Sequence, residues 1–181
     1  MTKRYALSAI GHDKPGIVAA VTGPLHKHDA NIEDSSMSIL EDEFAVILIM
    51  TMDEHHVSSL KEAIKGVEST TGLTFNIKEI PELIGEPAEV EPTHVITLHG
   101  ADAGGLVYRT ADLLAENKIN ITDLQTKRLR GEEGDIYIMI LEVVLSDDAT
   151  DSSDLEKKLN TLATELGVTI KIAAVEEHDP L

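Results

Sequence analysis

Apolar residues along this chain of 181 residues follow two spacings, and the order of these spacings occurs twice. Short apolar runs of strand length alternate with stretches in which apolar residues recur every three or four positions, as on one face of a helix. In the first half, the strand-like runs cover residues 5–10, 32–40, 44–52 and 73–80, and the helix-like stretches cover residues 17–25 and 57–67. This pattern predicts the order β-α-β-β-α-β.

The second half repeats this order. Its strand-like runs cover residues 94–99, 121–129, 136–145 and 168–175, and its helix-like stretches cover residues 106–114 and 155–166. Residues 44–52 and 136–145 are almost unbroken apolar sequence, which is typical of a strand buried inside a sheet. The two halves therefore predict two copies of one small domain.

A βαββαβ unit is the ferredoxin-like arrangement. Right-handed crossovers place both helices on one face of a four-stranded antiparallel sheet, so we expect an α+β fold with two such domains in tandem. We assign residues 1–80 to the first domain and residues 93–176 to the second. Residues 81–92, with three prolines, a glycine and several glutamates, are predicted to be a linker, and residues 177–181 a polar tail.

A short motif marks the start of both halves. Gly11-His12-Asp13-Lys14-Pro15-Gly16-Ile17-Val18 recurs 89 positions later as Gly100-Ala101-Asp102-Ala103-Gly104-Gly105-Leu106-Val107. Each copy lies between a predicted strand and a predicted helix, and we expect its first glycine to end the strand and turn the chain. The proline of the first copy suits the first turn of the helix. An Asn-Ile pair follows each copy at the same spacing, as Asn31-Ile32 and Asn120-Ile121.

The motif has chemistry that suits a free amino acid. The unpaired N–H groups at a helix N-terminus bind a carboxylate, and Asp13 can accept a hydrogen bond from an ammonium group. Asn31 offers both a donor and an acceptor. An alternative interpretation is that the motif is only a well-made connection between strand and helix, since duplication would copy a structural turn as well.

Composition narrows the classes of function. The chain has 33 acidic residues against 15 Lys and Arg, a net charge of -18, which argues against direct binding of nucleic acid. An acidic proteome in a salt-adapted organism would explain the charge equally well. No cysteine is present, which excludes disulfides, thiolate nucleophiles and Cys-ligated zinc. Aromatic residues make up only 3%, so we expect aliphatic cores.

Two further features of the sequence indicate the cellular compartment. The N-terminus runs directly into a strand pattern without an apolar signal segment. The longest apolar run, beginning at Phe44, is too short to cross a bilayer. We therefore expect a cytoplasmic protein that does not enter a membrane.

The remaining polar clusters give no second site. His26 and His28 lie two positions apart at a helix end and do not face the same way, so we predict no metal site. Lys127, Arg128 and Arg130 form the one basic cluster, which we expect to be a solvated hairpin tip. The serine pairs, Ser35-Ser36 and Ser58-Ser59, have no His and Asp at the spacing of a catalytic triad, so we predict no hydrolase. We predict no cofactor and no enzymatic activity.

The repeats and the two separated motifs in each half resemble ACT domains. ACT domains are regulatory modules that bind amino acids at domain interfaces. Two in tandem, covering essentially the whole chain, are similar to the glycine cleavage system transcriptional repressor family. The segments that carry this second resemblance are residues 11–17 and 31–37.

The resemblance implies a set of ligand contacts. They fall on Gly11, His12, Asp13, Pro15, Gly16, Ile17, Asn31 and Ile32 in the first repeat, and on Gly100, Asp102, Gly104, Gly105, Leu106, Asn120 and Ile121 in the second. The second copy has lost the proline and the lysine of the first, which makes it less preorganised. We therefore expect the first turn to be the better ligand site.

The resemblance also implies a function. We expect a non-enzymatic regulatory protein that binds a small amino acid, with glycine and serine as the leading candidates, and that signals through a protein partner such as a DNA-binding regulator. A homodimer is expected, because exposed sheet edges favour pairing. Alternatives are a stand-alone regulatory subunit of a metabolic enzyme, or an interaction module whose site has lost its function.

Overall fold

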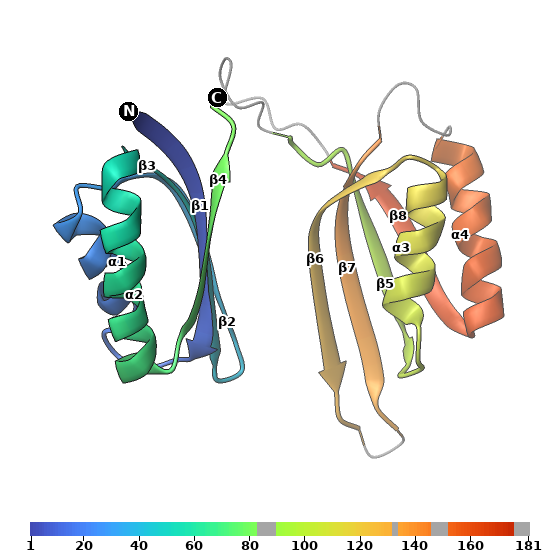
Figure 1. The fold of residues 1–181 in the computed structure, drawn as a ribbon. Helices are drawn as coiled ribbons and strands as arrows, with labels where there is room; N and C mark the ends of the chain where they lie inside the picture. The colour runs from blue at the N-terminus through green and yellow to red at the C-terminus, as the bar shows by residue number, and fades with distance from the viewer. Residues whose placement is uncertain (83–89, 132–133, 146–151, 176–181) are drawn as a thin grey trace, which may run out of the picture. The chain divides into compact units, whose positions relative to one another are not determined.

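A computed structural model describes residues 1–82, 90–131, 134–145 and 152–175 of the chain. The chain divides into two compact units, Met1–Pro87 and Ala88–Leu181 (Figure 1). The predicted linker at 81–92 lies partly outside the described residues, as does all of the tail at 177–181. Within the described ranges, no helix combines the length and apolar character that a membrane span requires.

The first unit has the predicted βαββαβ order, with a single-turn helix, η1, before the second long helix. The elements are β1 (Thr2–His12), α1 (Ile17–Lys27), β2 (Asn31–Leu40), β3 (Glu43–Asp53), η1 (Glu54–His56), α2 (Val57–Thr71) and β4 (Thr74–Ile80). The sheet is antiparallel with the strand order β2-β3-β1-β4, so β1 and β3 are the internal strands.

The second unit repeats this topology. Its elements are β5 (His94–Ala101), α3 (Leu106–Glu116), β6 (Asn120–Leu129), β7 (Ile136–Val144), α4 (Ser152–Leu166) and β8 (Val168–Ala174). The strand order is β6-β7-β5-β8, again with every neighbouring pair antiparallel. The prediction of two ferredoxin-like domains in tandem is confirmed.

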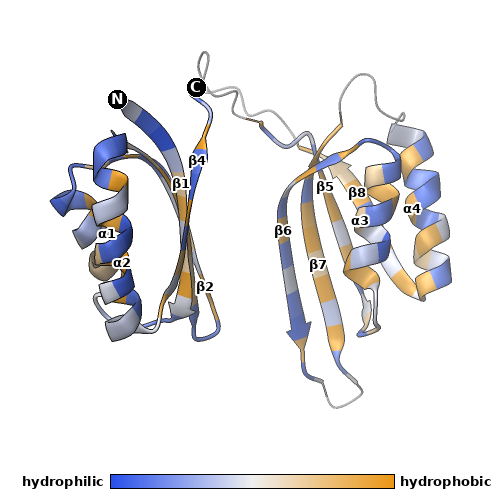
Figure 2. Ribbon diagram, in the orientation of Figure 1, coloured by the Kyte–Doolittle hydropathy of each residue, from blue (hydrophilic) through white to orange (hydrophobic). Residues whose placement is uncertain are grey.

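Each core lies between the helices and one face of the sheet. In α1 the buried residues Ile17, Val21 and Leu25 recur every fourth position and pack on alternate residues of β1 and β3. The other long helices likewise bury one set of residues in the core of their own unit, and Figure 2 shows apolar (orange) and polar (blue) segments alternating along α4. The cores are aliphatic as predicted, except that Phe44 is fully buried and Tyr5 almost so in the first unit.

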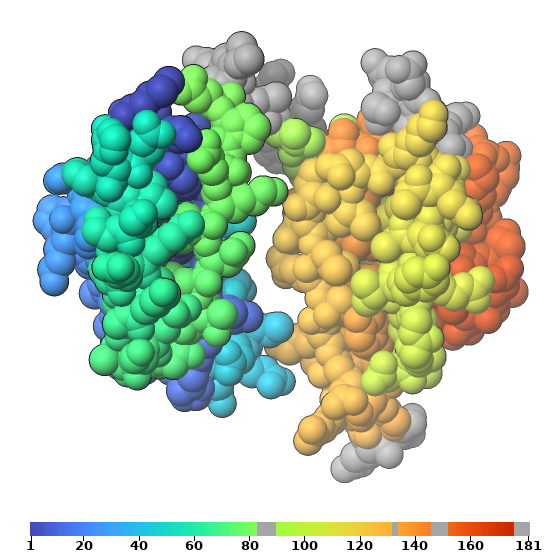
Figure 3. Space-filling view, viewed as in Figure 1, coloured from blue at the N-terminus to red at the C-terminus, as the bar shows by residue number. Residues whose placement is uncertain are grey.

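The hairpins β2–β3 and β6–β7 place an exposed strand at one edge of each sheet. All ten residues of β2 are exposed, and the surface of β6 is visible in Figure 3. Both edge strands carry a bulge directly after the Asn-Ile pair, between Ile32 and Asp34 and between Ile121 and Asp123. A bulge bends an edge strand and interrupts its ladder.

Two glycines of the first unit are expected to respond in opposite ways to replacement by alanine. Gly66 lies inside α2, and a Cβ added there meets no heavy atom within 4 Å. Gly16 precedes α1 with φ of 88°, a conformation that disfavours side chains. We expect Gly66→Ala to stabilise the unit by about 1 kcal/mol and Gly16→Ala to destabilise it by roughly 1–2 kcal/mol. Differential scanning calorimetry of both variants measures these changes, and equal shifts of the same sign would contradict the assignment.

Candidate ligand-binding turns

The first glycine of each motif lies within a strand, not in a turn. β1 continues to His12, and Gly11 pairs with Phe44 of β3. The prediction that this glycine ends the strand is therefore wrong. Its lack of a side chain is needed for another reason: a Cβ on Gly11 would lie 3.1 Å from Leu73 Cδ2 and 3.2 Å from the Gly72 carbonyl oxygen.

Gly100 is under the same constraint more severely. β5 continues to Ala101, and a Cβ on Gly100 would lie 2.6 Å from Val168 Cγ1. In both units the start of the last strand lies directly beside this glycine, since Gly100 pairs with Val168 and Gly11 lies next to Gly72 and Leu73. The glycine therefore serves packing.

The turns themselves are residues 13–16 and 102–105. Each ends in a left-handed glycine at the helix N-cap, with φ of 88° at Gly16 and 89° at Gly105. The helix begins at Ile17, so Pro15 lies in the turn that precedes the helix. The prediction that Pro15 occupies the first helical turn is wrong, because the left-handed Gly16 separates the proline from the helix.

Hydrogen bonds hold the first turn more firmly than the second. The Asp13 N–H donates to the Asp42 carbonyl (2.8 Å) and the Ile17 N–H to the Lys14 carbonyl (3.1 Å). Lys14 Nζ also donates to the Thr71 carbonyl (3.1 Å).

The second turn has fewer and longer backbone hydrogen bonds. The Asp102 N–H donates to the Asp135 carbonyl over 3.3 Å. The described residues there contain no bond between Leu106 and Ala103 equivalent to the one that closes the first turn. That the second copy is the less preorganised ligand site stays a prediction.

The aspartates of the two turns have different surroundings. Among the described residues, the Asp13 carboxylate has no ion-pair partner. The Asp102 carboxylate instead lies 3.5 Å from Nη1 of Arg128, whose Nε lies 3.6 Å from the Asp135 carboxylate. Arg128 was expected to be part of a solvated hairpin tip. The structure places its guanidinium at the second turn. β7 pairs with β5 on one side and with β6 on the other, and this pairing brings Arg128 of β6 level with the end of β5.

The helix N-terminus beside the first turn has donors to offer. The Ala20 N–H donates to the Gly16 carbonyl (2.9 Å). Among the described residues, the N–H groups of Val18 and Ala19 have no backbone acceptor outside the helix, as is usual for a first helical turn. With the Asp13 carboxylate nearby, this end of the unit presents donors for an anion and an acceptor for a cation.

The repeated spacing of Asn31 does not bring it to the turn. Gly11 pairs with Phe44, whereas Asn31 pairs with Thr51, seven positions farther along β3. At about 3.3 Å per residue, this separation is roughly 23 Å. In the second unit, the partners of Gly100 and Asn120 on β7 are again seven positions apart. One unit therefore cannot bind a small amino acid with its turn and its asparagine together, contrary to the sequence-based picture of a single cluster.

The predicted site residues thus fall into two groups in each unit. At one end lie Gly11, His12, Asp13, Pro15, Gly16 and Ile17, and in the second unit Gly100, Asp102, Gly104, Gly105 and Leu106. At the other end lie Asn31, Ile32, Asn120 and Ile121. Ile17 and Leu106 are buried in the cores and Ile121 packs against its core, whereas Asn31 and Asn120 are exposed.

The end of the first unit that carries Asn31 also holds charges that the sequence did not single out. Arg4 Nε donates to Glu33 Oε2 at 2.7 Å, and Glu33 is the bulged residue after Ile32. On the same end, hydrogen bonds from Lys3 to Glu79 and then to Glu54 raise the pKa of Lys3. Opposite charges that meet only through the register of the sheet give no local sequence signal.

The histidines at the helix ends have structural partners. His28 Nδ1 lies 2.8 Å from the Pro24 carbonyl oxygen, and His56 Nδ1 lies 3.3 Å from the His28 carbonyl oxygen. In the part of the chain that the structure describes, no three His, Asp or Glu side chains gather in a way that would hold a metal.

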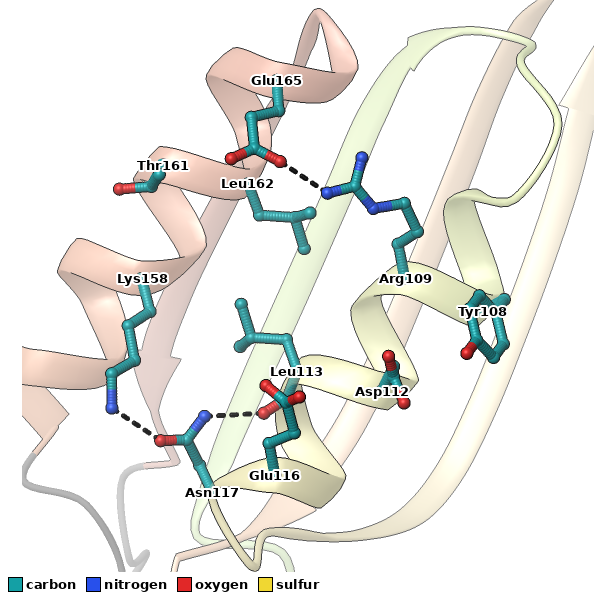
Figure 4. A pocket seen from close by; sticks show the side chains of 10 residues that line it. All are labelled: Tyr108, Arg109, Asp112, Leu113, Glu116, Asn117, Lys158, Thr161, Leu162 and Glu165. Carbon is teal, nitrogen blue, oxygen red and sulfur yellow. Dashed lines mark hydrogen bonds and ion pairs between the residues drawn. The ribbon is translucent and has the colours of Figure 1, made fainter.

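A groove of about 630 Å³ between α3 and α4 lies apart from the predicted site (Figure 4). Its lining residues are Tyr108, Arg109, Asp112, Leu113, Glu116, Asn117, Lys158, Thr161, Leu162 and Glu165. Arg109 forms an ion pair with Glu165 across the groove, and Lys158 donates to Asn117 Oδ1 at 2.7 Å. These two interactions link α3 to α4. Because Arg109 and Lys158 already have acceptors, the groove is a poor receptor for a ligand carboxylate.

Comparison with known proteins supports the family resemblance. A family model described as the ACT domain matches residues 5–78 and 93–173. The glycine cleavage system transcriptional repressor of Escherichia coli is 23% identical over 177 residues, which cover 96% of this chain and 92% of that protein. A UPF0237 protein of Methanopyrus kandleri is 44% identical over 55 residues, 30% of this chain and 61% of that protein.

Two crystal structures share the fold over nearly the whole chain. A Galdieria sulphuraria protein has a TM-score of 0.75 at 23% identity, with 97% of this chain and 100% of that chain covered. A protein provisionally assigned as a glycine cleavage system transcriptional repressor has a TM-score of 0.69 at 17% identity, with 98% and 99% covered. At this level of identity the two structures show only that the fold is shared.

The packing role of the strand glycines is open to a direct test. We expect both Gly100→Ala and Gly11→Ala to destabilise their units, by roughly 1–3 kcal/mol, because each adds a methyl group to a filled space. Gly100→Ala should cost more, since its Cβ comes closer to a neighbour. Thermal unfolding of the two variants measures the difference, and an unchanged melting temperature for Gly100→Ala would refute this role.

Proposed function

This chain belongs to the ACT domain family, and from that premise we propose that it is a non-enzymatic regulatory protein that binds a small amino acid. The observation that carries the proposal is the first turn, where an Asp13 carboxylate without an ion-pair partner among the described residues lies beside the N-terminus of α1. Such a pairing suits a zwitterion, because the helix end attracts the ligand carboxylate and Asp13 attracts its ammonium group.

Glycine and serine are the first ligands to test. The residues beside Asp13 in the turn include Gly16 and Pro15, which leave little side-chain bulk over the helix end. The name of the E. coli relative, a repressor of the glycine cleavage system, agrees with a glycine-related signal. The acidic chain, with a net charge of -18, is expected to act on transcription through a protein partner, not through DNA directly.

We assign the first turn as the stronger site. Its closing hydrogen bond from Ile17 to Lys14, and the tie from Lys14 to Thr71, fix the turn before a ligand arrives. Preorganisation of this kind lowers the cost of binding. The second turn, as far as the described residues show, lacks both features.

A thermal-shift screen of the standard amino acids tests this proposal. We expect a selective rise in the melting temperature of the wild-type protein with one or a few small amino acids. The rise should disappear in Asp13→Ala and weaken in Asn31→Ala. Asp112→Ala, which removes the same charge from the exposed face of α3, is the matched control and should respond like the wild type. A folded wild-type protein that responds to no amino acid would leave an interaction module as the better description.

The separation of turn and asparagine makes a second prediction. Because about 23 Å divides them in one unit, a ligand that touches both must join two ACT units, and we propose that these come from two copies of the chain. Binding then favours the dimer, since a ligand shifts an equilibrium only toward the state it binds better. Sedimentation velocity with and without the selected amino acid should show a larger dimer fraction with it. An unchanged distribution, with binding intact, would confine the ligand to the turn.

A further inference from the structure

Arg128 at the second turn has no charged counterpart at the first, and the registers of the two sheets allow a comparison position by position. Ile39 of β2 pairs with Phe44, which pairs with Gly11. In the second unit, Arg128 of β6 pairs with Tyr137, which pairs with Gly100. Arg128 therefore stands where the first unit has Ile39.

The acidic partners of Arg128 also have equivalents in the first unit. Asp102 and Asp135 are joined by a backbone hydrogen bond of 3.3 Å, and Asp13 and Asp42 by the same bond at 2.8 Å. Asp102 of the second turn and Asp135, which directly precedes β7, thus share a guanidinium that lies 3.5 Å from one and 3.6 Å from the other. In the first unit the corresponding aspartates are Asp13 of the turn and Asp42, which directly precedes β3, and no described cation pairs with either carboxylate.

We propose that Arg128 fills, at the second turn, the cation position that an amino-acid ammonium group takes at the first turn beside Asp13 and Asp42. The inference rests on the proposed function and deepens it. It adds Asp42 to the ligand contacts of the first turn. It also makes Arg128 the residue that closes the second turn, so that one chain binds one amino acid.

The physical reason for closure is competition from a tethered charge. The guanidinium is held on the neighbouring hairpin, so its effective concentration at Asp102 exceeds that of a free metabolite. An ammonium group that approached Asp102 would also be repelled by the guanidinium. At a separation of a few ångströms near a protein surface, that repulsion corresponds to roughly a tenfold or greater loss of affinity.

Ile39 leaves the first turn without such a competitor on the neighbouring strand, and the turn's own cation, Lys14, donates its Nζ to the Thr71 carbonyl (3.1 Å). Ile39 is exposed, as is the Arg128 side chain, so it offers an open apolar neighbour in place of a charge. The ammonium of a ligand can then reach the carboxylates of the first turn.

Isothermal titration calorimetry on the full chain tests the inference, with each standard amino acid as the probe. The variants are Asp13→Asn, Asp42→Asn, Arg128→Gln, Arg128→Lys, and Asp13→Asn combined with each Arg128 change. Arg128→Ile, which installs the first unit's own residue type, is a second route if the glutamine variant fails to fold. Asp112→Asn is the charge-matched control, and circular dichroism checks the fold of every variant.

We expect one site per chain in the wild type, no binding in Asp13→Asn, and roughly tenfold weaker binding in Asp42→Asn. Arg128→Gln should raise the stoichiometry to two sites. Asp13→Asn combined with Arg128→Gln should recover binding, whereas Asp13→Asn combined with Arg128→Lys should not, since lysine keeps the charge.

The outcomes separate this inference from the proposed function. Two sites in the wild type, or binding that survives in Asp13→Asn, would show the second turn to be open and overturn the inference alone. Binding in the wild type with no gain in any neutral Arg128 variant would do the same. A wild type and an Arg128→Gln variant that both bind no amino acid would overturn the inference and the proposed function together.

Discussion

Both units depend on close packing at the end of their first strand, where only glycine fits. β1 is paired on both sides, by β3 and β4, and β5 is paired in the same way by β7 and β8. The chain entering the last strand passes so close to Gly11 and Gly100 that neither position has room for a side chain. Five residues later, a left-handed glycine starts the helix. These two backbone constraints place the N-terminus of the first helix at the end of the sheet and so determine where a ligand can meet it.

The same geometry separates the parts of the predicted site. The first helix runs back along the sheet, so the strand that follows it starts at the opposite end from the turn. Asn31 and the turn are therefore as far apart as the length of the helix between them requires. Any ligand that uses both must bring two units together, which gives binding a direct physical link to assembly. A ligand held by the turn alone would lack that link.

Within the described residues, the order and type of the strands and long helices follow from the spacing of apolar residues, because burial against one face of a sheet imposes that spacing. The functions of individual residues in the motif do not follow in the same way. Gly11 was expected to end a strand. The structure instead shows that a side chain at this position would contact Leu73, a residue far along the chain that approaches only in the folded sheet. Pro15 was expected inside the helix, yet the φ of Gly16 moves the helix start past it. Long-range pairing likewise explains why the sequence did not reveal the position of Arg128, since only the registers of β5, β6 and β7 bring it to its two aspartates.

The duplication helps to separate what folding needs from what a ligand needs. The glycines at positions 11, 16, 100 and 105 are explained by close approach or by positive φ, so their recurrence says nothing about binding. The aspartates are different: neither helix has a side-chain hydrogen bond at its N-cap, so Asp13 and Asp102 do not serve as caps. In the second unit the carboxylate has a cation from its own chain, and in the first it has none among the described residues. A carboxylate that the fold does not use, and that one copy neutralises internally, is the part of the motif for which a bound cation is the simplest physical reason.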